Sequence, residues 1–344
     1  MCFSRRIFVF FTGIFFCDLD FRRKAHPQPL EMDSSLRAQI HGIVRRLYQH
    51  PSKLFPTQQP RSFDRASFVN IFQDCDSYVV SQKANGLHMT LVFANLPKLG
   101  NFCCMMDRSE NIFIHEVVAP ADFFLGTLIT GELQDDVFYA FDAVSYCGRS
   151  LLFEFYEKRM ECSNRISEFF DGEILRFSGK PLFYRTKKTY GMRDFLANFR
   201  SISNDDGLIF MPIDKPLTKT LPFKWKEKHT VDLMVRFRRL ESSPRFAHQI
   251  VQPLGIGNVS LEQTENCILL STFDDLAGPD LSIVDFCVVL ECLISPGMCV
   301  VPVKFRHDKK SANLAATVLG TMRSVAENIS RSEIVDMFLS ISSQ

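Results

Sequence analysis

Residues 78–88 have the sequence Tyr78-Val79-Val80-Ser81-Gln82-Lys83-Ala84-Asn85-Gly86-Leu87-His88, in which one lysine follows an apolar run and precedes an Asn-Gly pair. The aromatic and β-branched residues from Tyr78 to Val80 predict a buried strand. Asn85-Gly86 is typical of a tight hairpin turn, because both residues tolerate positive φ angles. We therefore expect Lys83 at the end of a strand, with Met89 to Ala94 as the second strand of the hairpin.

A lysine at the end of a buried strand has two interpretations. An ammonium group is costly to bury unless anions surround it, and the uncharged amine is a nucleophile. Beside an Asn-Gly turn, however, a solvated surface lysine is the commoner case. The residues downstream of Lys83 must decide between the two.

The composition is that of an ordinary globular protein. With 344 residues the chain is long enough for two domains, and 46% of its residues are hydrophobic and 23% charged. A formal net charge of +1 excludes a grip of the whole protein on a polyanion, so any contact with nucleic acid must be local. The 11 cysteines are scattered and contain no C-x-x-C pair, which favours a reducing compartment over disulfides or zinc.

Residues 1–31 differ from the rest of the chain. An apolar run from Ile7 to Cys17 lies between Arg5-Arg6 and the basic residues Arg22 to Lys24, as in a signal peptide, but no small-residue cleavage site follows. The run is also too short to span a bilayer as a helix. We expect a dispensable extension or an upstream start, with the fold beginning near Met32; secretion or membrane anchoring is the alternative.

Helical spacing of apolar residues predicts one helix over Ser34 to Tyr48, with Ser34 or Ser35 as its N-cap, and another over Leu151 to Phe170. Between them, Cys103 to Met106 and Ile112 to Val117 predict a pair of strands. The charged residues of the second helix are expected on its solvated side; they are Glu154, Glu157, Lys158, Arg159, Glu161 and Arg165.

Several strands carry polar groups that need a partner. Glu132 follows a glycine on the apolar strand 126–133, Asp142 interrupts an aromatic strand, and Asp206 precedes Gly207 and another apolar strand. An edge carboxylate facing water is an equally good reading of Glu132.

Two lysines flank the only tryptophan of the chain, in Lys224-Trp225-Lys226. Strand alternation places Lys224 and Lys226 on one face, where two ammonium groups repel each other unless an anion lies between them. We interpret that anion as a phosphate. The segment from Leu182 to Tyr190 also mixes aromatic residues with Arg185, Lys187 and Lys188, which suits a base or phosphate contact or a basic surface loop.

The C-terminal part of the chain is rich in strands. Alternation and short connections predict a small barrel, whose strands are Val231 to Phe237, Cys267 to Phe273, Ile283 to Cys292 and Cys299 to Phe305. Leu314, Val318, Met322 and Val325 have helical spacing, and Ser332 is the expected cap of a final helix through Phe338.

In this order, these residues resemble the motifs of the covalent nucleotidyltransferases, and most closely those of the eukaryotic and viral mRNA capping guanylyltransferases. The similar segments are Lys83-Ala84-Asn85-Gly86, Asp107-Arg108, Thr130-Gly131-Glu132-Leu133, Phe141-Asp142-Ala143-Val144, Asp206-Gly207-Leu208-Ile209, Phe223-Lys224-Trp225-Lys226 with Thr230-Val231-Asp232, and Phe305-Arg306-His307-Asp308-Lys309-Lys310-Ser311-Ala312-Asn313. Phe55-Pro56 resembles a loop that precedes the lysine in cellular capping enzymes. Polynucleotide ligases do not, as a rule, share both of the last two segments in this form, so the resemblance favours capping over ligation.

The resemblance implies a role for each residue. Lys83 becomes covalently guanylylated, and Glu132 and Asp206 hold Mg²⁺ or Mn²⁺. The nucleotide-binding residues are Arg108, Glu132, Lys187, Lys188, Lys224, Lys226, Arg306, Asp308 and Lys309, with either Lys187 or Lys188 recognising guanine.

The resemblance also implies an α+β fold, in which a nucleotidyltransferase domain with ATP-grasp-like antiparallel sheets and helices precedes an OB-fold β-barrel. We expect these domains at residues 32–232 and 233–326, with a C-terminal helix in 327–344 that packs back on the first domain. A hinge near Val231 to Arg239 would let the barrel close over the triphosphate.

The implied function is mRNA guanylyl transfer: GMP passes from GTP to Lys83 and then to the 5′-diphosphate end of RNA. The implied partners are GTP, that RNA, a separate RNA 5′-triphosphatase and the C-terminal domain of RNA polymerase II, in the nucleus and without a membrane. The alternatives are an ATP-dependent ligase-like nucleotidyltransferase and a catalytically weak cap- or RNA-binding relative.

Four positions depart from the family pattern. Asn85 replaces an aspartate, His88 an arginine and Ala312 a proline. Thr130 stands where the family's D-G-E motif has its aspartate, just before Gly131-Glu132. Asn85 can still form hydrogen bonds but cannot neutralise a cation. We therefore expect a working enzyme of reduced efficiency.

Overall fold

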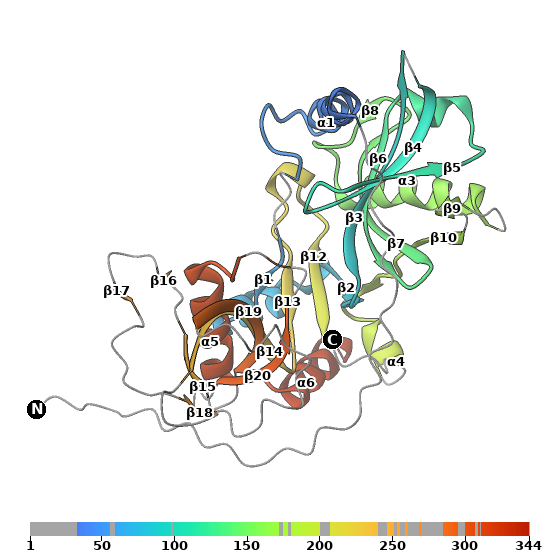
Figure 1. Ribbon diagram of the computed structural model, residues 1–344. Coiled ribbons are helices and arrows are strands. Elements are labelled where there is room, and N and C mark those ends of the chain that lie inside the picture. Colours follow the sequence, from blue (N-terminus) through green and yellow to red (C-terminus); the bar gives the residue numbers. More distant parts are fainter. Residues whose placement is uncertain are drawn as a thin grey trace, which may run out of the picture. The chain divides into compact units, whose positions relative to one another are not determined.

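Figure 1 shows a computed structural model of the chain, which describes residues 33–55, 59–97, 99–171, 175–177, 180–199, 207–239, 246–250, 253–254, 259–260, 268–269, 285–294, 300–306, 309 and 311–343. They divide into two units. The larger unit holds the described residues of 33–61, 69–225 and 335–343, and the smaller unit those of 62–68 and 226–334.

The first sheet of the larger unit contains the strand that ends at Lys83. Its strand order is β1-β13-β12-β2-β11, with β1 at Arg61–Ser62, β2 at Tyr78–Gln82, β11 at Tyr190–Gly191, β12 at Leu208–Pro212 and β13 at Phe223–Trp225. β12 is antiparallel to both β2 and β13, so it joins the two lysine-bearing segments, which are far apart in the sequence.

A cluster of phenylalanines supports one face of the first sheet. Phe210 of β12 is fully buried and stacks on Phe338 of α6 (Arg331–Ser342) with ring centroids 6.3 Å apart. The Phe338 ring also lies 5.0 Å from that of Phe72 in α2 (Arg65–Gln73) and 4.9 Å from that of Phe195 in α4 (Phe195–Phe199). The end of the chain thus completes the core beneath this sheet.

The second sheet has eight strands and is closed by a parallel pair. Its order is β10-β9-β5-β4-β3-β6-β7-β8, and β10 also pairs with β7 in parallel; every other pair is antiparallel. The strands are β3 (Leu87–Leu96), β4 (Gly100–Asp107), β5 (Ile112–Glu116), β6 (Thr127–Gln134), β7 (Val137–Tyr146), β8 (Arg149–Ser150), β9 (Leu175–Phe177) and β10 (Lys180–Thr186).

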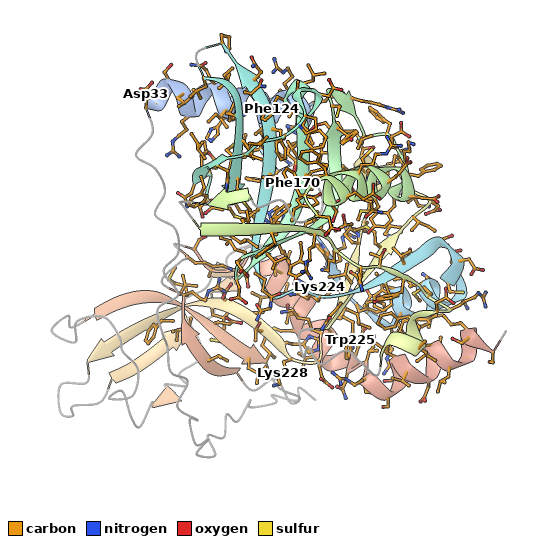
Figure 2. The ribbon with its side chains drawn as sticks, turned by 90° about the vertical axis from the view of Figure 1, so that its right-hand side faces the viewer. Asp33, Phe124, Phe170, Lys224, Trp225 and Lys228 are labelled. Atoms are coloured by element: carbon orange, nitrogen blue, oxygen red, sulfur yellow. The ribbon has the colours of Figure 1, made fainter. Side chains whose placement is uncertain are left out.

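Helices cover both faces of the second sheet (Figure 1). Val44 of α1 (Ser34–Leu47) shares one buried cluster with Val92 and Leu128. Ile166 of α3 (Tyr156–Phe169) shares the other with Phe93, and Figure 2 labels two further members of that cluster, Phe124 and Phe170. Alternate residues of the central strands therefore point into two separate cores.

The expected hairpin at Asn85-Gly86 is wrong. β2 lies in the first sheet and β3 in the second, so residues 83–86 connect two sheets, and neither Asn85 nor Gly86 has a positive φ. Gly86 is instead required by close packing, because an added Cβ would lie 2.6 Å from the carbonyl oxygen of Leu133 and 3.3 Å from Cβ of Glu132. The other expected pair, β4 with β5, is confirmed.

Two predictions about the helix over Leu151 to Phe170 are corrected. α3 begins only at Tyr156, and Arg159 is fully buried rather than on the solvated side. Arg159 lies in the same stripe as Tyr156, Ser163 and Ile166, at the spacing of a core-facing helix side.

The expected caps of the first and last helices are also corrected. The N-cap of α1 is Asp33, so Ser34 and Ser35 are inside the helix. In α6, Ser330 and Glu333 form the reciprocal pair of a capping box: the Glu333 N–H donates to Ser330 Oγ at 3.2 Å and the Ser330 N–H donates to Glu333 Oε2 at 3.1 Å. Ser332 is therefore not the cap.

The smaller unit contains a third sheet, which is antiparallel and has the order β18-β15-β14-β19-β20. Its strands are β14 (His229–Arg239), β15 (Phe246–Ile250), β18 (Ile268–Leu269), β19 (Asp285–Ile294) and β20 (Val300–Phe305). α5 (Ala315–Glu327) packs against β14. Two short strands, β16 (Pro253–Leu254) and β17 (Val259–Ser260), pair with each other, and the α+β class is confirmed.

Some expectations fall outside the described residues. They concern the extension 1–31 and the two acids Asp206 and Asp308. In the part of the chain that the structure covers, no helix is long and apolar enough to cross a membrane.

Candidate active site

The register of the first sheet brings Lys83 and Lys224 to the same face. Ser81 pairs with Ile209, which in turn pairs with Lys224, so the side chains of this row point the same way. The Lys83 N–H donates to the carbonyl oxygen of Gly207 at 2.9 Å, which extends the β2–β12 ladder by one bond. Lys83 follows Ser81 by two residues and therefore shares this face.

The opposite face of β13 is occupied by Trp225, which is buried, while Lys224 is half-buried (Figure 2). Two strand spacings of about 4.8 Å separate the rows of β2 and β13, so Ser81 and Lys224 lie on the order of 10 Å apart at their Cα atoms. Lys83 is half-buried, and its Nζ donates to the carbonyl oxygen of Ala84 at 3.1 Å. Lys226 follows β13 directly and is half-buried too.

The second sheet contributes Glu132, His88 and Arg108 from adjacent strands. Glu132 pairs with His88, and the pairing of Met89 with Asp107 places Arg108 next in the same row. The charges of Arg108 and Glu132 attract each other. Because Gly86 packs on Glu132, this row meets the connection that carries Lys83.

His88 is a neutral side chain between two aromatic rings. Its ring centroid lies 6.0 Å from that of Phe55 and 5.8 Å from that of Phe141. Burial, with the nearby Arg108 guanidinium as a smaller cause, lowers the pKa of His88 from 6.5 to about 3. The arginine of the family motif is thus replaced by an uncharged group, and the site loses one positive charge.

Thr130, which stands in place of an acid, is satisfied by the backbone. Its Oγ1 donates to the carbonyl oxygen of Asp142 at 3.3 Å, and the residue is buried. The following Gly131 allows the ring of Phe138 to approach, since an added Cβ would lie 2.4 Å from that ring. Glu132 follows Gly131 directly and is half-buried.

The carboxylates of Asp142 and Asp107 have structural partners. Asp142 is buried against Arg159, whose Nε donates to Oδ1 at 2.6 Å. Asp107 accepts from the Asn111 backbone N–H at 2.9 Å and from Asn111 Nδ2 at 2.8 Å, which closes the turn after β4 and leaves Arg108 exposed beside it. The importance of Arg159 was missed from the sequence, although its position in the core stripe of α3 was a usable signal.

The two candidate guanine-reading lysines differ in exposure. Lys187 is half-buried and its N–H donates to the carbonyl oxygen of Ala140 at 2.7 Å, which extends the β7–β10 ladder. Lys188 is exposed. The bond to Ala140 places Lys187 at the edge of the β7–β10 pair.

In the smaller unit, Asp232 binds two of the residues expected to bind phosphates, Arg306 and Lys309. Its Oδ1 accepts from Arg306 Nη1 at 2.8 Å and its Oδ2 from Lys309 Nζ. Its backbone N–H donates to Asn313 Oδ1 at 2.8 Å, and the Asn313 N–H donates back to its carbonyl oxygen at 2.8 Å. Asp232 therefore anchors the segment 306–313 to β14, a role that the sequence did not indicate.

The carboxylates present are compatible with a magnesium-type ion. No group of three or more His, Cys, Asp or Glu side chains within the described ranges could form a metal cage. Mg²⁺, however, is commonly held by one or two carboxylates together with substrate phosphates. Glu132, close to the lysine-bearing connection, fits that arrangement.

The fold and this motif order agree with a match to known proteins. A family model described as mRNA capping enzyme, catalytic domain, matches residues 24–228, which is more than half of the chain. The chain therefore belongs to the mRNA capping enzyme catalytic-domain family.

Two curated relatives are each named mRNA-capping enzyme subunit alpha. The protein from Candida glabrata is 26% identical over 225 residues, which cover 53% of this chain and 49% of the relative. The protein from Schizosaccharomyces pombe is 20% identical over 319 residues, which cover 82% of this chain and 79% of the relative. The chain thus spans about half the length of the Candida protein in that alignment.

Proposed function

We propose that this chain is an mRNA guanylyltransferase, which transfers GMP from GTP through a covalent lysyl-GMP to the 5′-diphosphate end of RNA. The observation that carries the proposal is the shared face of Lys83 and Lys224 on the first sheet. An amine at the end of one strand faces the cation of a nearby strand, as an enzyme that attacks the innermost phosphate of a nucleotide requires.

The first step joins Lys83 to the nucleotide. The uncharged Nζ of Lys83 attacks the α-phosphorus of GTP, a nitrogen–phosphorus bond forms, the bond from the α-phosphorus to the bridging oxygen breaks, and pyrophosphate leaves as the amine loses its proton to solvent. Lys224 and Lys226 stabilise the charge on the α-phosphate, and Arg306, Asp308 and Lys309 engage the β- and γ-phosphates. A divalent ion, Mg²⁺ or Mn²⁺, held by Glu132 and Asp206 with the phosphates, would offset the phosphate charge.

The second step releases Lys83. A terminal oxygen of the RNA 5′-diphosphate attacks the same phosphorus, a phosphorus–oxygen bond forms, and the nitrogen–phosphorus bond breaks as the amine regains a proton. Arg108, Lys187 and Lys188 hold the nucleotide during both steps.

The setting that we propose follows from the same reasoning. The third sheet, with five antiparallel strands, supports an OB-fold in the smaller unit. Because the relatives are named as alpha subunits, we propose a separate RNA 5′-triphosphatase as a partner. A nuclear location and contact with the C-terminal domain of RNA polymerase II complete the proposal.

Labelling with GTP tests the proposal directly. The purified chain is incubated with magnesium or manganese and GTP labelled at the α-phosphate, separated on a denaturing gel, and the labelled peptide is mapped. We expect label on Lys83, no label in Lys83→Met, and full label in Lys53→Met, which alters an exposed lysine elsewhere. Label from ATP but not GTP would instead indicate a ligase-like enzyme, and no label from either would refute the proposal.

A further inference from the structure

The outer face of the β7–β10 pair carries aromatic and basic side chains with no assigned role. The parallel register pairs Arg185 with Tyr139 and Phe183 with Val137. Alternate residues of both strands point the other way into the core; they are Leu182, Tyr184, Phe138 and Ala140. Tyr139, Phe183 and Arg185 therefore form one strip on the outside of the sheet, which we call the β7–β10 strip.

The strip exposes groups that proteins usually cover or pair. Phe183 is 38% exposed and Arg185 is exposed beside it, while Tyr139 is half-buried. Arg185 forms no ion pair with another described residue. By contrast, the exposed Arg149, Arg165 and Arg193 of the same unit are paired with Glu154, Glu161 and Asp76.

The strip is continuous with the candidate active site. Tyr139 pairs with Glu132 across β6 and β7, and Glu132 pairs with His88 across β6 and β3. Arg185 is thus two strand spacings, about 10 Å, from Glu132 along one row of the sheet. A ligand that leaves the site along this row meets Tyr139 first and then Arg185.

This chemistry matches single-stranded nucleic acid. Proteins bind unpaired strands by stacking bases on aromatic rings and by placing cations against the phosphates between them. The net charge of +1 requires such a contact to be local. Asp135 and Asp136, in the turn before Val137, would repel a phosphate beyond Phe183 and so limit the length of the contact.

We propose that the β7–β10 strip binds the first unpaired nucleotides of the RNA that accepts GMP, with bases on Tyr139 and Phe183 and a phosphodiester on Arg185. This inference rests on the proposed function for the identity of the RNA as acceptor. It adds a surface for the polynucleotide to a site otherwise built around a mononucleotide.

Direct binding tests the strip without requiring guanylyl transfer. The full chain is titrated against a short single-stranded RNA with a 5′-diphosphate, without GTP, at several salt concentrations. Tyr139→Ala is expected to weaken binding by about five- to a hundredfold, as for loss of one stacked base. Arg185→Gln is expected to weaken binding and to reduce the slope of log affinity against log salt by about 0.7.

Two controls separate this effect from general ones. Tyr139→Phe keeps the ring and should retain RNA affinity. Arg46→Gln removes an exposed arginine on α1 and should leave the affinity unchanged at a fixed salt concentration.

A second readout separates the strip from the nucleotide site. Formation of lysyl-GMP from GTP needs no RNA and should change far less than RNA affinity in Tyr139→Ala and Arg185→Gln. Equal losses in both assays would assign the strip to GTP, and unchanged RNA affinity, or no RNA binding by the unaltered chain, would overturn the inference. Absence of lysyl-GMP in the unaltered chain would refute the proposed function. The binding assay would still show whether the β7–β10 strip binds RNA.

Discussion

Arg159 of α3 binds both carboxylate oxygens of Asp142 of β7 inside the larger unit, with Nε 2.6 Å from Oδ1 and Nη2 3.0 Å from Oδ2. Arg159 is fully buried, and its Nη1 also donates to the carbonyl oxygen of Glu154 at 2.8 Å. The pair fixes α3 to the strand that also carries Tyr139 and Phe141. Because both side chains are buried, water could not take the place of either partner if the other were removed.

Removal of Arg159 should therefore destabilise the fold. We expect Arg159→Met to lower the free energy of unfolding by about 3–5 kcal/mol, because Asp142 would remain buried and uncompensated. Urea denaturation measures the change. Arg165→Met, which removes an exposed arginine from the same helix, should cost less than about 1 kcal/mol, and equal costs would contradict this assignment.

Gly86 should be essential for activity more than for folding. Its alanine variant would place Cβ 2.6 Å from the carbonyl oxygen of Leu133, so the connection that carries Lys83 must move. We expect lysyl-GMP formation to fall by about 10- to 100-fold in Gly86→Ala, since small misplacements of reacting groups have effects of this size. Gly42→Ala, where the added Cβ meets no atom within 4 Å, is the control and should keep full activity.

His88 should make stability depend on pH in the acidic range. Its pKa is lowered from 6.5 to about 3 in the folded chain, so the unfolded chain binds more protons between these values. The neutral imidazole therefore contributes stability that is fully present above pH 6.5 and is lost as the pH falls towards 3. We expect His88→Gln to reduce the slope of unfolding free energy against pH in this window by up to about 1.4 kcal/mol per pH unit.

Denaturant titrations between these pH values measure that slope. His50→Gln, which alters a histidine of the loop after α1, serves as the comparison. An identical slope in His88→Gln and the unaltered chain would show that folding does not lower the pKa of His88.

Asp232 should be required for efficient lysyl-GMP formation, because it positions Arg306 and Lys309. In Asp232→Asn both cations lose a carboxylate at hydrogen-bond distance, while Arg306 retains Glu291, whose Oε2 lies 3.7 Å from its Nη1. We expect lysyl-GMP formation from GTP to fall by about 10- to 100-fold. Arg306→Ala should show the same selective loss. Transfer of GMP to RNA from adduct formed beforehand should be retained, because the pyrophosphate has already left.

Adduct formation and RNA transfer are measured separately for these variants. Asp214→Asn removes an exposed acid paired with Lys215 and should leave both steps unchanged. Unaltered adduct formation in Asp232→Asn would contradict the positioning role.

Much of the candidate site could be predicted from local sequence. Alternation in Lys224-Trp225-Lys226 was enough to place Trp225 in the core and Lys224 on the other face, because the period of a strand is two residues. Pairing partners were harder. Asn85-Gly86 satisfied a local rule for a hairpin, yet the glycine was required by the backbone of Leu133, nearly fifty residues further along the chain.

The sequence-based predictions failed mainly for charged residues whose partners lie in other helices or strands. Arginine is a residue type normally found at the surface. The burial of Arg159 is explained by its contact with Asp142, 17 residues away in the chain. The structural role of Asp232 likewise depends on its contact with Arg306, 74 residues away in the chain. Neither partner can be identified from spacing, since the distance along the chain does not determine which strands become neighbours.

The position of Phe338 makes activity depend on a helix that carries none of the motif residues. This ring fills the space between Phe72, Phe195 and Phe210 beneath the sheet whose central strand pairs with β2. A chain without α6 would lack this ring, so the strand that leads to Lys83 would lose part of its support. Proteolytic removal of α6 should therefore silence the enzyme while sparing every motif that defines it.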